Sequence, residues 1–367
     1  MRLPQKSNQE GYMLQLDSLR GIAVFGVMCH HFLYTSSFFS YYGSAGVQLF
    51  FLLSGYLITG ILLKCKDIVT SGKQNVHFII QRFYIRRFLR LVPAYYLLLI
   101  ITAIINIEPV RKSLIWHLTY TSNFYFSIIN NWDGPVSHFW TLSVEEQFYL
   151  IWPFFILLVP NKMLLTSMLM VAALGPISRF FCIEMELSKF WLWTSIFTNL
   201  DSLAMGGVLA FCTYNKKQLK QFKIYLCNFG LRIGIPLYIF CLTNNYHHFL
   251  SDTWLEILNQ TIQSFCFVWL VDRAAQGFRG ITGTILELRL LTYLGKISYG
   301  IYLYHNFIPV LLAKFSAYIL IYWGFNLSIN FFHEVIITVI IAILSWHLIE
   351  KPINNFKQHF NYLKKEQ

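Results

Sequence analysis

Long apolar stretches, separated by short polar segments, recur along almost the whole chain. A helix needs about 20 mostly apolar residues to cross the roughly 30 Å hydrocarbon core of a bilayer. By that rule the pattern predicts ten membrane-spanning helices, at 20–38, 45–64, 90–107, 139–159, 163–182, 191–212, 224–243, 253–271, 290–313 and 331–349. Two further apolar stretches, 114–130 and 318–325, are rich in aromatic residues and are expected to be interfacial or re-entrant.

The composition supports a membrane protein. Of 367 residues, 56% are hydrophobic and 13% are charged, and the mean hydropathy is +0.50. A soluble domain carries about 25% charged residues. We therefore expect an all-α, polytopic helical bundle, with a cytoplasmic N-terminus (1–19), a transmembrane domain (20–350) and a cytoplasmic basic tail (351–367). The first apolar stretch lacks a small-residue cleavage site, which favours a retained span over a signal peptide.

The basic residues indicate how the helices are oriented. The net charge of +12 comes from residues between apolar stretches, not from one basic stripe, so nucleic acid is not an expected partner. Membrane proteins concentrate Lys and Arg in their cytoplasmic loops. The predicted topology leaves all but five of the 29 basic residues on one side, which places both termini in the cytoplasm. The five exceptions are Arg111, Lys112, Arg179, Lys189 and Lys314.

The seven cysteines are scattered and lie mostly within apolar stretches. No C-x-x-C, H-E-x-x-H or G-x-G-x-x-G motif occurs, so the sequence indicates no disulfide framework, no metal site and no nucleotide fold. Buried free cysteine behaves as a small hydrophobic residue. We expect all seven cysteines to contribute to packing.

The stretch LRGIAVFGVMCHHF places polar groups in a predicted span. Eleven residues make about three helical turns, so Arg20 and His31 share a helix face and differ by about 16 Å in depth. Ionisable groups at mid-membrane usually face a polar cavity, which favours a functional His31 over a core histidine bonded to a neighbouring helix. His30 points elsewhere and is expected to be structural. Asp17 either caps this helix or pairs with Arg20.

The stretch HFWTLSVEEQFYLIWP places two carboxylates inside another span. Glu145 and Glu146 lie about 11 Å from its outer end, hence about 19 Å from the inner face and close to the expected depth of His31. Adjacent carboxylates cannot both face one partner. We expect one to serve the cavity and the other a structural contact, although a simple hydrogen bond between helices is an alternative for either.

The stretch RFYIRRFLRLVP places four arginines at the cytoplasmic entrance of the third span. Arg87 and Arg90, three residues apart, lie on one face of a helix. Such a pair suits a phosphate-bearing ligand, whereas Arg82 and Arg86 are as well explained by cytoplasmic anchoring.

Two other stretches carry polar residues within spans. In GVQLFFLLSGYL, Ser54 and its neighbouring glycine favour close helix packing. In YLGKISYGIYLYH, Lys296 either extends its side chain to the interface or joins the phosphate site, and the same span holds Tyr302. His305 is expected about 22 Å above the cytoplasmic end of this span, above His31.

Taken in their order along the chain, these stretches, together with NLDSLAMGGVLA and a closing EKP, resemble the acyltransferase-3 family. The resemblance runs from about residue 14 to 355, and six motifs in order make it specific. The family consists of bacterial multi-pass enzymes that O-acylate cell-surface glycans. Its R-x10-H, R-x-x-R and acidic-pair motifs fall on Arg20 and His31, Arg87 and Arg90, and Glu145 and Glu146. The chain departs from the family at Ser18, where many relatives have Gly, and at Asn199, where arginine is common.

The resemblance implies transfer of an acetyl group, or another acyl group, from cytoplasmic acetyl-CoA to a sugar hydroxyl at the outer face of the bacterial inner membrane. Acetyl-CoA would be a co-substrate and not a permanently bound cofactor. The resemblance is to stand-alone forms such as O-antigen acetylases. It therefore implies lipopolysaccharide O-antigen, or a lipid-linked saccharide, as the acceptor, with membrane lipids as the surroundings.

The residues suggest a mechanism that fits this activity. Arg87 and Arg90, helped by Arg20 and Lys296, would hold the CoA phosphates. His31 would take the hydroxyl proton, or form an acyl-histidine, while Glu145 or Glu146 orients its imidazole or binds the acceptor. Supporting roles are predicted for Asp17, Ser54, Tyr302 and His305. Two alternatives stay open: a secondary transporter of a sugar or proton-coupled solute, and a non-catalytic assembly partner.

Overall fold

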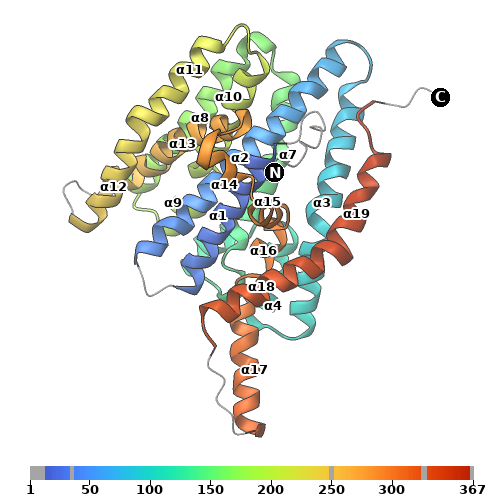
Figure 1. Ribbon diagram of the computed structural model, residues 1–367, viewed down its shortest axis with the longest axis vertical. Coiled ribbons are helices and arrows are strands. Elements are labelled where there is room, and N and C mark those ends of the chain that lie inside the picture. Colours follow the sequence, from blue (N-terminus) through green and yellow to red (C-terminus); the bar gives the residue numbers. More distant parts are fainter. Residues whose placement is uncertain (1–12, 34–36, 248–251, 324–328, 364–367) are drawn as a thin grey trace.

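A computed structural model describes residues 13–33, 37–247, 252–323 and 329–363. Within those ranges the secondary structure is entirely helical, as the sequence predicts (Figure 1). The first half of the chain contains α1 (Leu14–Phe32), α2 (Ser37–Thr70), α3 (Val76–Ile104), α4 (Glu108–Lys112), α5 (Leu114–Leu118), α6 (Ser122–Ile129), a short 3-10 helix η1 (Gly134–Val136), α7 (Phe139–Leu158) and α8 (Asn161–Glu184).

The second half contains more interrupted helices. These are α9 (Lys189–Thr194), the 3-10 helix η2 (Phe197–Asn199), α10 (Leu200–Tyr214), α11 (Lys220–Phe229), the π-helix η3 (Gly230–Gly234), α12 (Ile235–His247), α13 (Asp252–Gln276), α14 (Gly280–Leu286), α15 (Arg289–Lys296), α16 (Ser298–Tyr304), α17 (Phe307–Trp323), α18 (Phe331–Ser345), the π-helix η4 (Trp346–Glu350), α19 (Lys351–Asn355) and the 3-10 helix η5 (Phe356–His359).

The predicted count of ten spans is not confirmed. By length and composition, five helical stretches in the described ranges could cross a membrane: 42–70, 76–104, 161–184, 220–243 and 331–359. The bent pair α16–α17 would make a sixth. The predicted spans 20–38, 139–159, 191–212 and 253–271 do not qualify. The first, second and fourth correspond to α1, α7 and α13, whose acidic, basic or amide side chains lower the mean hydropathy, and the third is a broken helix.

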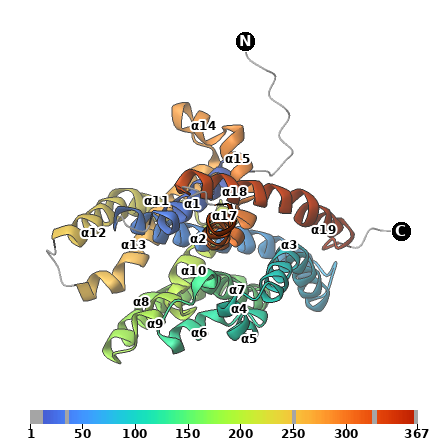
Figure 2. The ribbon, with the colours of Figure 1, turned by 90° about the horizontal axis from the view of Figure 1, so that it is seen from below.

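Helix α2 lies at the centre of the bundle (Figures 1 and 2). Its most apolar window is 67% buried, against 17–28% for the other four candidate spans. Helix α10 crosses it closely: a Cβ at Gly55 would lie 1.9 Å from the carbonyl oxygen of Leu203, and one at Gly206 would lie 2.1 Å from that of Leu52. The packing role predicted for the small residues of α2 is therefore confirmed, because only glycine permits this approach.

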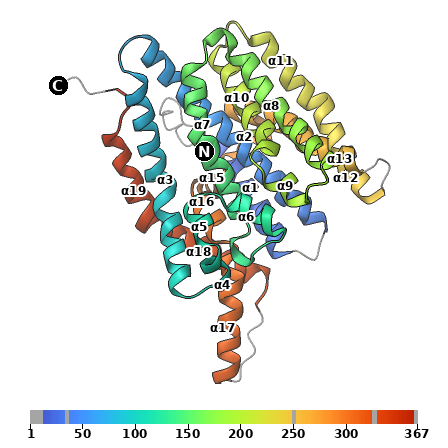
Figure 3. The same ribbon diagram turned by 180° about the vertical axis from the view of Figure 1, so that it is seen from behind.

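The remaining helices surround this centre. In Figure 1, α8, α11, α12 and α13 lie to one side of α2, while α3 and α19 lie to the other and α17 projects away from the bundle. Helices α6 and α9 pack against α7 (Figure 3). The segment 114–130 forms short helices of five and eight residues, too short to cross a bilayer, as expected of an interfacial or re-entrant segment. The stretch 318–325, predicted to be interfacial or re-entrant, continues α17 as far as Trp323, and residues 324 and 325 lie outside the described ranges.

Proline residues account for three of the helix irregularities. Pro309 lacks the N–H that would bond the carbonyl of His305, and its ring would clash with that carbonyl in a straight helix. The predicted span 290–313 is consequently broken at His305, and α16 and α17 are bent by 50°. Pro236 and Pro352 each follow a π-helix, η3 and η4, in which the backbone widens before the missing donor.

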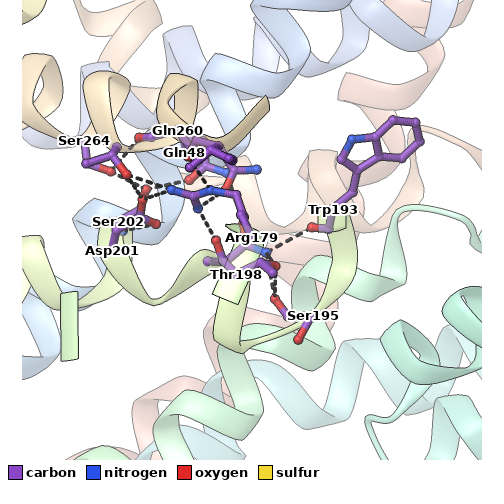
Figure 4. Close-up of polar contacts among 12 residues, drawn as sticks. Gln48, Arg179, Trp193, Ser195, Thr198, Asp201, Ser202, Gln260 and Ser264 are labelled. Atoms are coloured by element: carbon purple, nitrogen blue, oxygen red, sulfur yellow. Dashed lines mark hydrogen bonds and ion pairs between the residues drawn. The ribbon is translucent and has the colours of Figure 1, made fainter. Parts of the chain in front are cut away.

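The predicted span 191–212 is broken between α9 and α10. The side-chain amide of Asn199 donates hydrogen bonds of 2.9 Å and 2.8 Å to the carbonyl oxygens of Trp193 and Ser195, which the break leaves without helical partners (Figure 4). Thr198 also donates to the carbonyl of Ser195. Polar side chains thus replace the lost backbone bonds, as a buried helix break requires.

A buried ion pair lies beside this break. Arg179 of α8 is 0% exposed and pairs with Asp201 of α10 at 2.7 Å (Figure 4). Its guanidinium donates four further hydrogen bonds, to oxygens of Thr198, Ile257, Gln260 and Thr261. The predicted topology places Arg179 on or near the outer side, and the structure shows that its side chain points into the bundle, where Asp201 neutralises it.

The beginning of the predicted basic tail is helical. Residues 351–359 continue α18 through α19 and η5, and the tail packs against α3. Arg86 donates hydrogen bonds of 2.8 Å and 3.3 Å to the carbonyl oxygens of Lys357 and Phe360, while Arg82 stacks on the Phe360 ring. These two arginines therefore hold the tail in place. Six of the seven cysteines are buried, which agrees with a packing role.

Candidate active site

A cavity enclosing about 750 Å³, its open mouth included, lies between α1, α2, α3, α7 and α16. It brings together six residues predicted from sequence. They are Arg20, Ser54, Arg87, Arg90, Glu145 and Tyr302. Much of the remaining wall is apolar, from residues such as Val47, Phe50, Leu57, Leu91 and Leu142. We refer to this space as the arginine cavity.

The three guanidinium groups of the arginine cavity differ in the protein groups that they contact. Arg20 lies 3.6 Å from Asp17, one turn earlier in α1, which confirms the predicted pairing; the residue before α1 is Met13, so Asp17 is not its cap. Arg87 stacks over the rings of Phe83 and Tyr149. Within the described ranges, neither Arg87 nor Arg90 donates a hydrogen bond or forms an ion pair. Their N–H donors are therefore available to an anionic ligand.

Glu145 is fixed at the wall of the arginine cavity. Ser54 of α2 donates a hydrogen bond of 2.8 Å to its Oε1, and Tyr149, one turn further along α7, donates one of 3.3 Å to its Oε2. The hydroxyl groups of Ser54 and Tyr149 are themselves 2.6 Å apart. The supporting role predicted for Ser54 thus has a definite geometry: it holds a carboxylate near three arginines.

Glu146 faces a different space. It lines a groove of about 880 Å³ between α3, α7 and Phe360. Arg87 and Tyr149 line both this groove and the arginine cavity. The expectation that only one of the two adjacent carboxylates serves the cavity is confirmed, and Glu145 is that one. Glu146 lies on the neighbouring face of α7 because successive residues of a helix are turned by about 100°.

Three histidines from different helices meet at the far end of α16. His305 Nε2 lies 3.3 Å from His31 Nδ1, and their ring centroids are 4.8 Å apart. The ring of His138, at the start of α7, lies 4.7 Å from that of His305. His305 is completely buried, whereas His31 is partly exposed. His31 therefore contacts another protein group, as either a functional histidine or a core histidine bonded to a neighbouring helix would.

Tyr302 joins the arginine cavity to the histidines. Its hydroxyl lies 2.6 Å from Oγ1 of Thr141, which also lines the cavity, and 3.4 Å from the carbonyl oxygen of His138. Its ring centroid is 5.4 Å from that of His305, one turn later. Polar groups thus continue from the guanidinium groups to His31.

Among the described residues, His31 contacts His305 and not Glu145. His31 is at the level of His138, and His138 and Glu145 are seven residues apart on α7, which is about 10 Å. Glu145 therefore does not orient the His31 imidazole. His305 takes that place, with its Nε2 3.3 Å from His31 Nδ1.

Among known proteins, the acyltransferase domain family matches residues 13–350, nearly the whole chain. The chain belongs to the acyltransferase-3 family. This membership favours the acyltransferase interpretation over the transporter and assembly alternatives, for which the three arginines would have no evident use.

Several curated relatives are O-acetyltransferases. The chain is 29% identical over 382 residues to peptidoglycan O-acetyltransferase OatA of Listeria monocytogenes, an alignment that covers 96% of this chain and 58% of the relative. It is 28% identical to the putative peptidoglycan O-acetyltransferase YrhL of Bacillus subtilis, over 95% of this chain and 56% of the relative. It is 26% identical to O-acetyltransferase OatA of Staphylococcus aureus, over 99% and 61%. The chain thus spans about three fifths of their length, and no solved structure matches it.

The predicted site residues did not include Thr141, Tyr149, Ser298 and Tyr299, which line the arginine cavity, or His138, which contacts His305. Thr141 and Tyr149 flank Glu145 at four residues on either side and line the same cavity. Together with His138, they form one face of α7 with the spacing of three and four residues that places side chains in a row. Applying the helical period to all polar residues of this span, and not only to its carboxylates, would have found them.

Of the predicted site residues, Asp17, His31, Glu146, Lys296 and His305 do not line the arginine cavity. Lys296 is exposed at the end of α15 and does not line the cavity, so its participation in phosphate binding stays a prediction without geometric support. Asn199 bonds the carbonyls at the break before α10 and accepts a hydrogen bond from Gln48. In this chain the loop is structural, and the arginine that neutralises Asp201 comes from α8.

Proposed function

We propose that this chain transfers an acetyl group from acetyl-CoA to a hydroxyl group of a cell-envelope glycan. In this proposal it resides in the bacterial cytoplasmic membrane, among membrane lipids, with both termini in the cytoplasm. Family membership and the names of the relatives support acyl transfer. The excess of basic residues on one predicted side supports the orientation.

The observation that carries the proposal is the arginine cavity. CoA has a pyrophosphate and a third phosphate, and the cavity offers guanidinium groups of Arg20, Arg87 and Arg90 against one carboxylate in its described lining. Arginine binds phosphate oxygens through two parallel N–H donors, a geometry that lysine lacks. The apolar part of the wall suits the uncharged pantetheine arm, which would extend toward Tyr302.

The proposed chemistry takes place where the polar groups end at His31. The acceptor hydroxyl gives its proton to the imidazole while its oxygen attacks the thioester carbonyl. The carbon–sulfur bond then breaks, and the thiolate of CoA takes the proton back from the imidazolium as it leaves. Glu145, which lies elsewhere, balances the charge of the arginines and keeps Ser54 and Tyr149 in place. Neither the charged donor nor the glycan needs to cross the membrane, because only the acetyl group is transferred.

Peptidoglycan is the first acceptor to examine, because two of the relatives carry that name. The O-antigen of lipopolysaccharide, which the sequence resemblance suggested, is the second. Both are saccharides with free hydroxyl groups, so the proposed donor site and base would serve either. The acceptor must therefore be identified by finding which glycan carries the acetyl group, because the donor site does not distinguish the two.

The test replaces His31 by Ala in cells that depend on this protein for glycan acetylation. Peptidoglycan fragments and O-antigen are purified separately, and mass spectrometry measures the acetyl mass on each. We expect the His31→Ala variant to lose the acetyl mass from one glycan, whereas His30→Ala, a change of the adjacent ring, retains it. Retained acetylation in a correctly inserted His31→Ala variant refutes the role of His31; acetylation of neither glycan by the wild type refutes the proposed acceptor class.

A further inference from the structure

Hydrogen bonds connect His31 to the backbone through His305. His305 Nδ1 lies 2.6 Å from the carbonyl oxygen of Tyr302, and its Nε2 lies 3.3 Å from His31 Nδ1. His31 Nδ1 also lies 3.0 Å from the carbonyl oxygen of Val27, one turn earlier in α1. Within the described ranges, His31 Nε2 has no hydrogen-bond partner.

These hydrogen-bond partners determine which nitrogen carries the proton in the neutral rings of His31 and His305. A carbonyl oxygen only accepts, so His305 Nδ1 must carry a proton and His305 Nε2 must be an acceptor. Both neighbours of His31 Nδ1, the Val27 carbonyl and His305 Nε2, are then acceptors. His31 Nδ1 therefore carries the proton, shared between the two, and the lone pair of the ring is on Nε2.

We propose that His305 is the positioning residue that, together with the Val27 carbonyl oxygen, holds His31 in the Nδ1-protonated tautomer and presents its Nε2 as the base of the transfer reaction. This inference rests on the proposed function, which assigns the base to His31 without choosing a nitrogen. A base needs a free lone pair directed at the substrate, and a second group bonded to the other nitrogen holds it there. His305 supplies that second group in a position where the sequence had led us to expect Glu145.

The fold holds His305 rigidly. It is 0% exposed, and it occupies the break between α16 and α17, whose 50° bend follows from Pro309. The titratable groups that face the pair are His30 on α1, whose ring centroid is 4.7 Å from that of His31, and His138 on α7, at 4.7 Å from His305. No carboxylate among the described residues bonds to either ring of the pair. His305 is thus the acceptor available to an N–H of His31 beyond its own helix.

In the proposed step, the hydroxyl proton of the acceptor moves to His31 Nε2, and the resulting imidazolium keeps its Nδ1 proton between Val27 and His305. When CoA leaves, the proton on Nε2 passes to the thiolate, and the starting tautomer returns. His305 neither gains nor loses a proton in this sequence. It acts on the reaction by orienting His31 and by accepting a stronger hydrogen bond when His31 is charged.

The test compares two replacements of similar size. His305→Phe keeps a buried ring but removes the acceptor, whereas His305→Gln keeps an amide oxygen that can reach His31 Nδ1. Initial rates of CoA release from acetyl-CoA are measured in membrane vesicles that contain the native acceptor. Loss of the required tautomer costs a serine protease about 10⁴-fold in kcat, so we expect His305→Phe to lower kcat by about 10²- to 10⁴-fold with KM for acetyl-CoA unchanged within about twofold. His305→Gln should retain at least about a tenth of the wild-type kcat.

The matched control is His30→Phe, which replaces the other ring beside His31 but removes no hydrogen bond found in the described ranges. It should retain the wild-type kcat within about twofold, and gel-filtration elution and thermal midpoint identify variants that fold. Wild-type kcat in folded His305→Phe overturns the inference. Equal loss of kcat in folded His305→Phe and His305→Gln overturns it as well.

A second measurement separates positioning from packing. In ¹⁵N-histidine-labelled protein, the His31 signals are assigned by their absence in His31→Ala, and they should show a protonated Nδ1 and an unprotonated Nε2. His305→Phe should move the proton to Nε2 in part of the molecules. A protonated Nε2 in the neutral wild type overturns the inference, even if His31→Ala is inactive and the proposed function stands. If His31→Ala is active, the proposed function fails instead.

Discussion

The Oγ of Ser54 donates a hydrogen bond of 2.8 Å to Oε1 of Glu145, and this bond ties α2 to α7 at the wall of the arginine cavity. Glu145 is the single carboxylate among the described residues that line this cavity, against three guanidinium groups. Because Glu145 and the arginines share a partly desolvated space, its negative charge reduces the attraction between the cavity and an anionic ligand. The negative charge of Glu145 thus lowers the affinity for an anionic ligand while it stabilises the three neighbouring arginines.

Removing that charge should tighten the binding of acetyl-CoA. In Glu145→Gln the amide can keep the contacts to Ser54 and Tyr149, but the cavity loses its negative charge. We expect the Kd for acetyl-CoA, measured by titration calorimetry at low ionic strength, to fall by about three- to tenfold, with a smaller change at high salt. Glu186→Gln, an exposed carboxylate far from the cavity lining, should leave Kd unchanged. Weaker binding by Glu145→Gln would show that Glu145 contacts the donor directly.

Replacing either free arginine should weaken the same binding. A charge-assisted hydrogen bond contributes about 1.5–3 kcal/mol, so Arg87→Gln and Arg90→Gln should each raise the Kd for acetyl-CoA by about ten- to a hundredfold. The dependence of Kd on salt should also become shallower, because one charge fewer meets the phosphates.

Arg82→Gln is the matched control for this change. Arg82 belongs to the same helix, but it stacks on Phe78 and Phe360 and does not line the cavity. Its replacement should leave Kd within about twofold of the wild-type value. If Arg82→Gln weakens binding as much as Arg87→Gln does, the arginines act through the general charge of α3 and not through a site.

The sequence predicted the members of the arginine cavity better than their vertical arrangement. Helical spacing alone indicated that Arg87 and Arg90 share a face and that only one of Glu145 and Glu146 serves a cavity, because those relations depend on neighbouring residues of one helix. The depth of His305 depended on a straight helix from 290 to 313. In the structure this stretch is interrupted at Ile297, between α15 and α16, and bent by 50° between α16 and α17, and only the second interruption has a proline, Pro309, as its signal in the sequence.

The same distinction, between local relations and those set by distant segments, explains which membrane spans the sequence could predict. Hydropathy predicted stretches such as 163–182 and 224–243 because other helices bury little of their surface, so their side chains must be apolar to face lipid. Helix α10 differs: nearly all its residues are buried, so its surroundings are set by other helices and not by the bilayer. Hydropathy alone could not predict that the stretch before it would break at Asn199, because the break is stabilised by side-chain hydrogen bonds, some from Asn199 itself and some from Gln48 and Arg179 of distant helices.

The buried ion pair between Arg179 and Asp201 should be essential for stability. Breaking a buried pair by removing one partner leaves an uncompensated charge and costs about 3–5 kcal/mol. We expect Arg179→Met to lower the free energy of unfolding by that amount, measured by denaturant titration in detergent, and the double change Arg179→Met with Asp201→Asn to recover part of the loss.

An exposed ion pair provides the comparison. Lys189 and Glu256 lie 3.0 Å apart, and their side chains are 67% and 30% exposed. Lys189→Met should lower the free energy of unfolding by less than about 1 kcal/mol, because water already screens this pair. Equal losses in Arg179→Met and Lys189→Met would contradict a structural role specific to the buried pair.

Two glycines of α2 should respond oppositely to the same substitution. A Cβ at Gly55 would lie 1.9 Å from the carbonyl oxygen of Leu203 on α10, whereas a Cβ at Gly60 meets no atom within 4 Å. Gly55→Ala must therefore push α10 away from α2 and should lower the thermal midpoint strongly, in line with the roughly 1–3 kcal/mol typical of overpacking. Gly60→Ala adds a better helix former in open space and should raise stability by up to about 1 kcal/mol. The thermal midpoints of both variants in the same detergent test this directly, and a Gly55→Ala protein as stable as Gly60→Ala would mean that the two helices do not cross as closely as the structure places them.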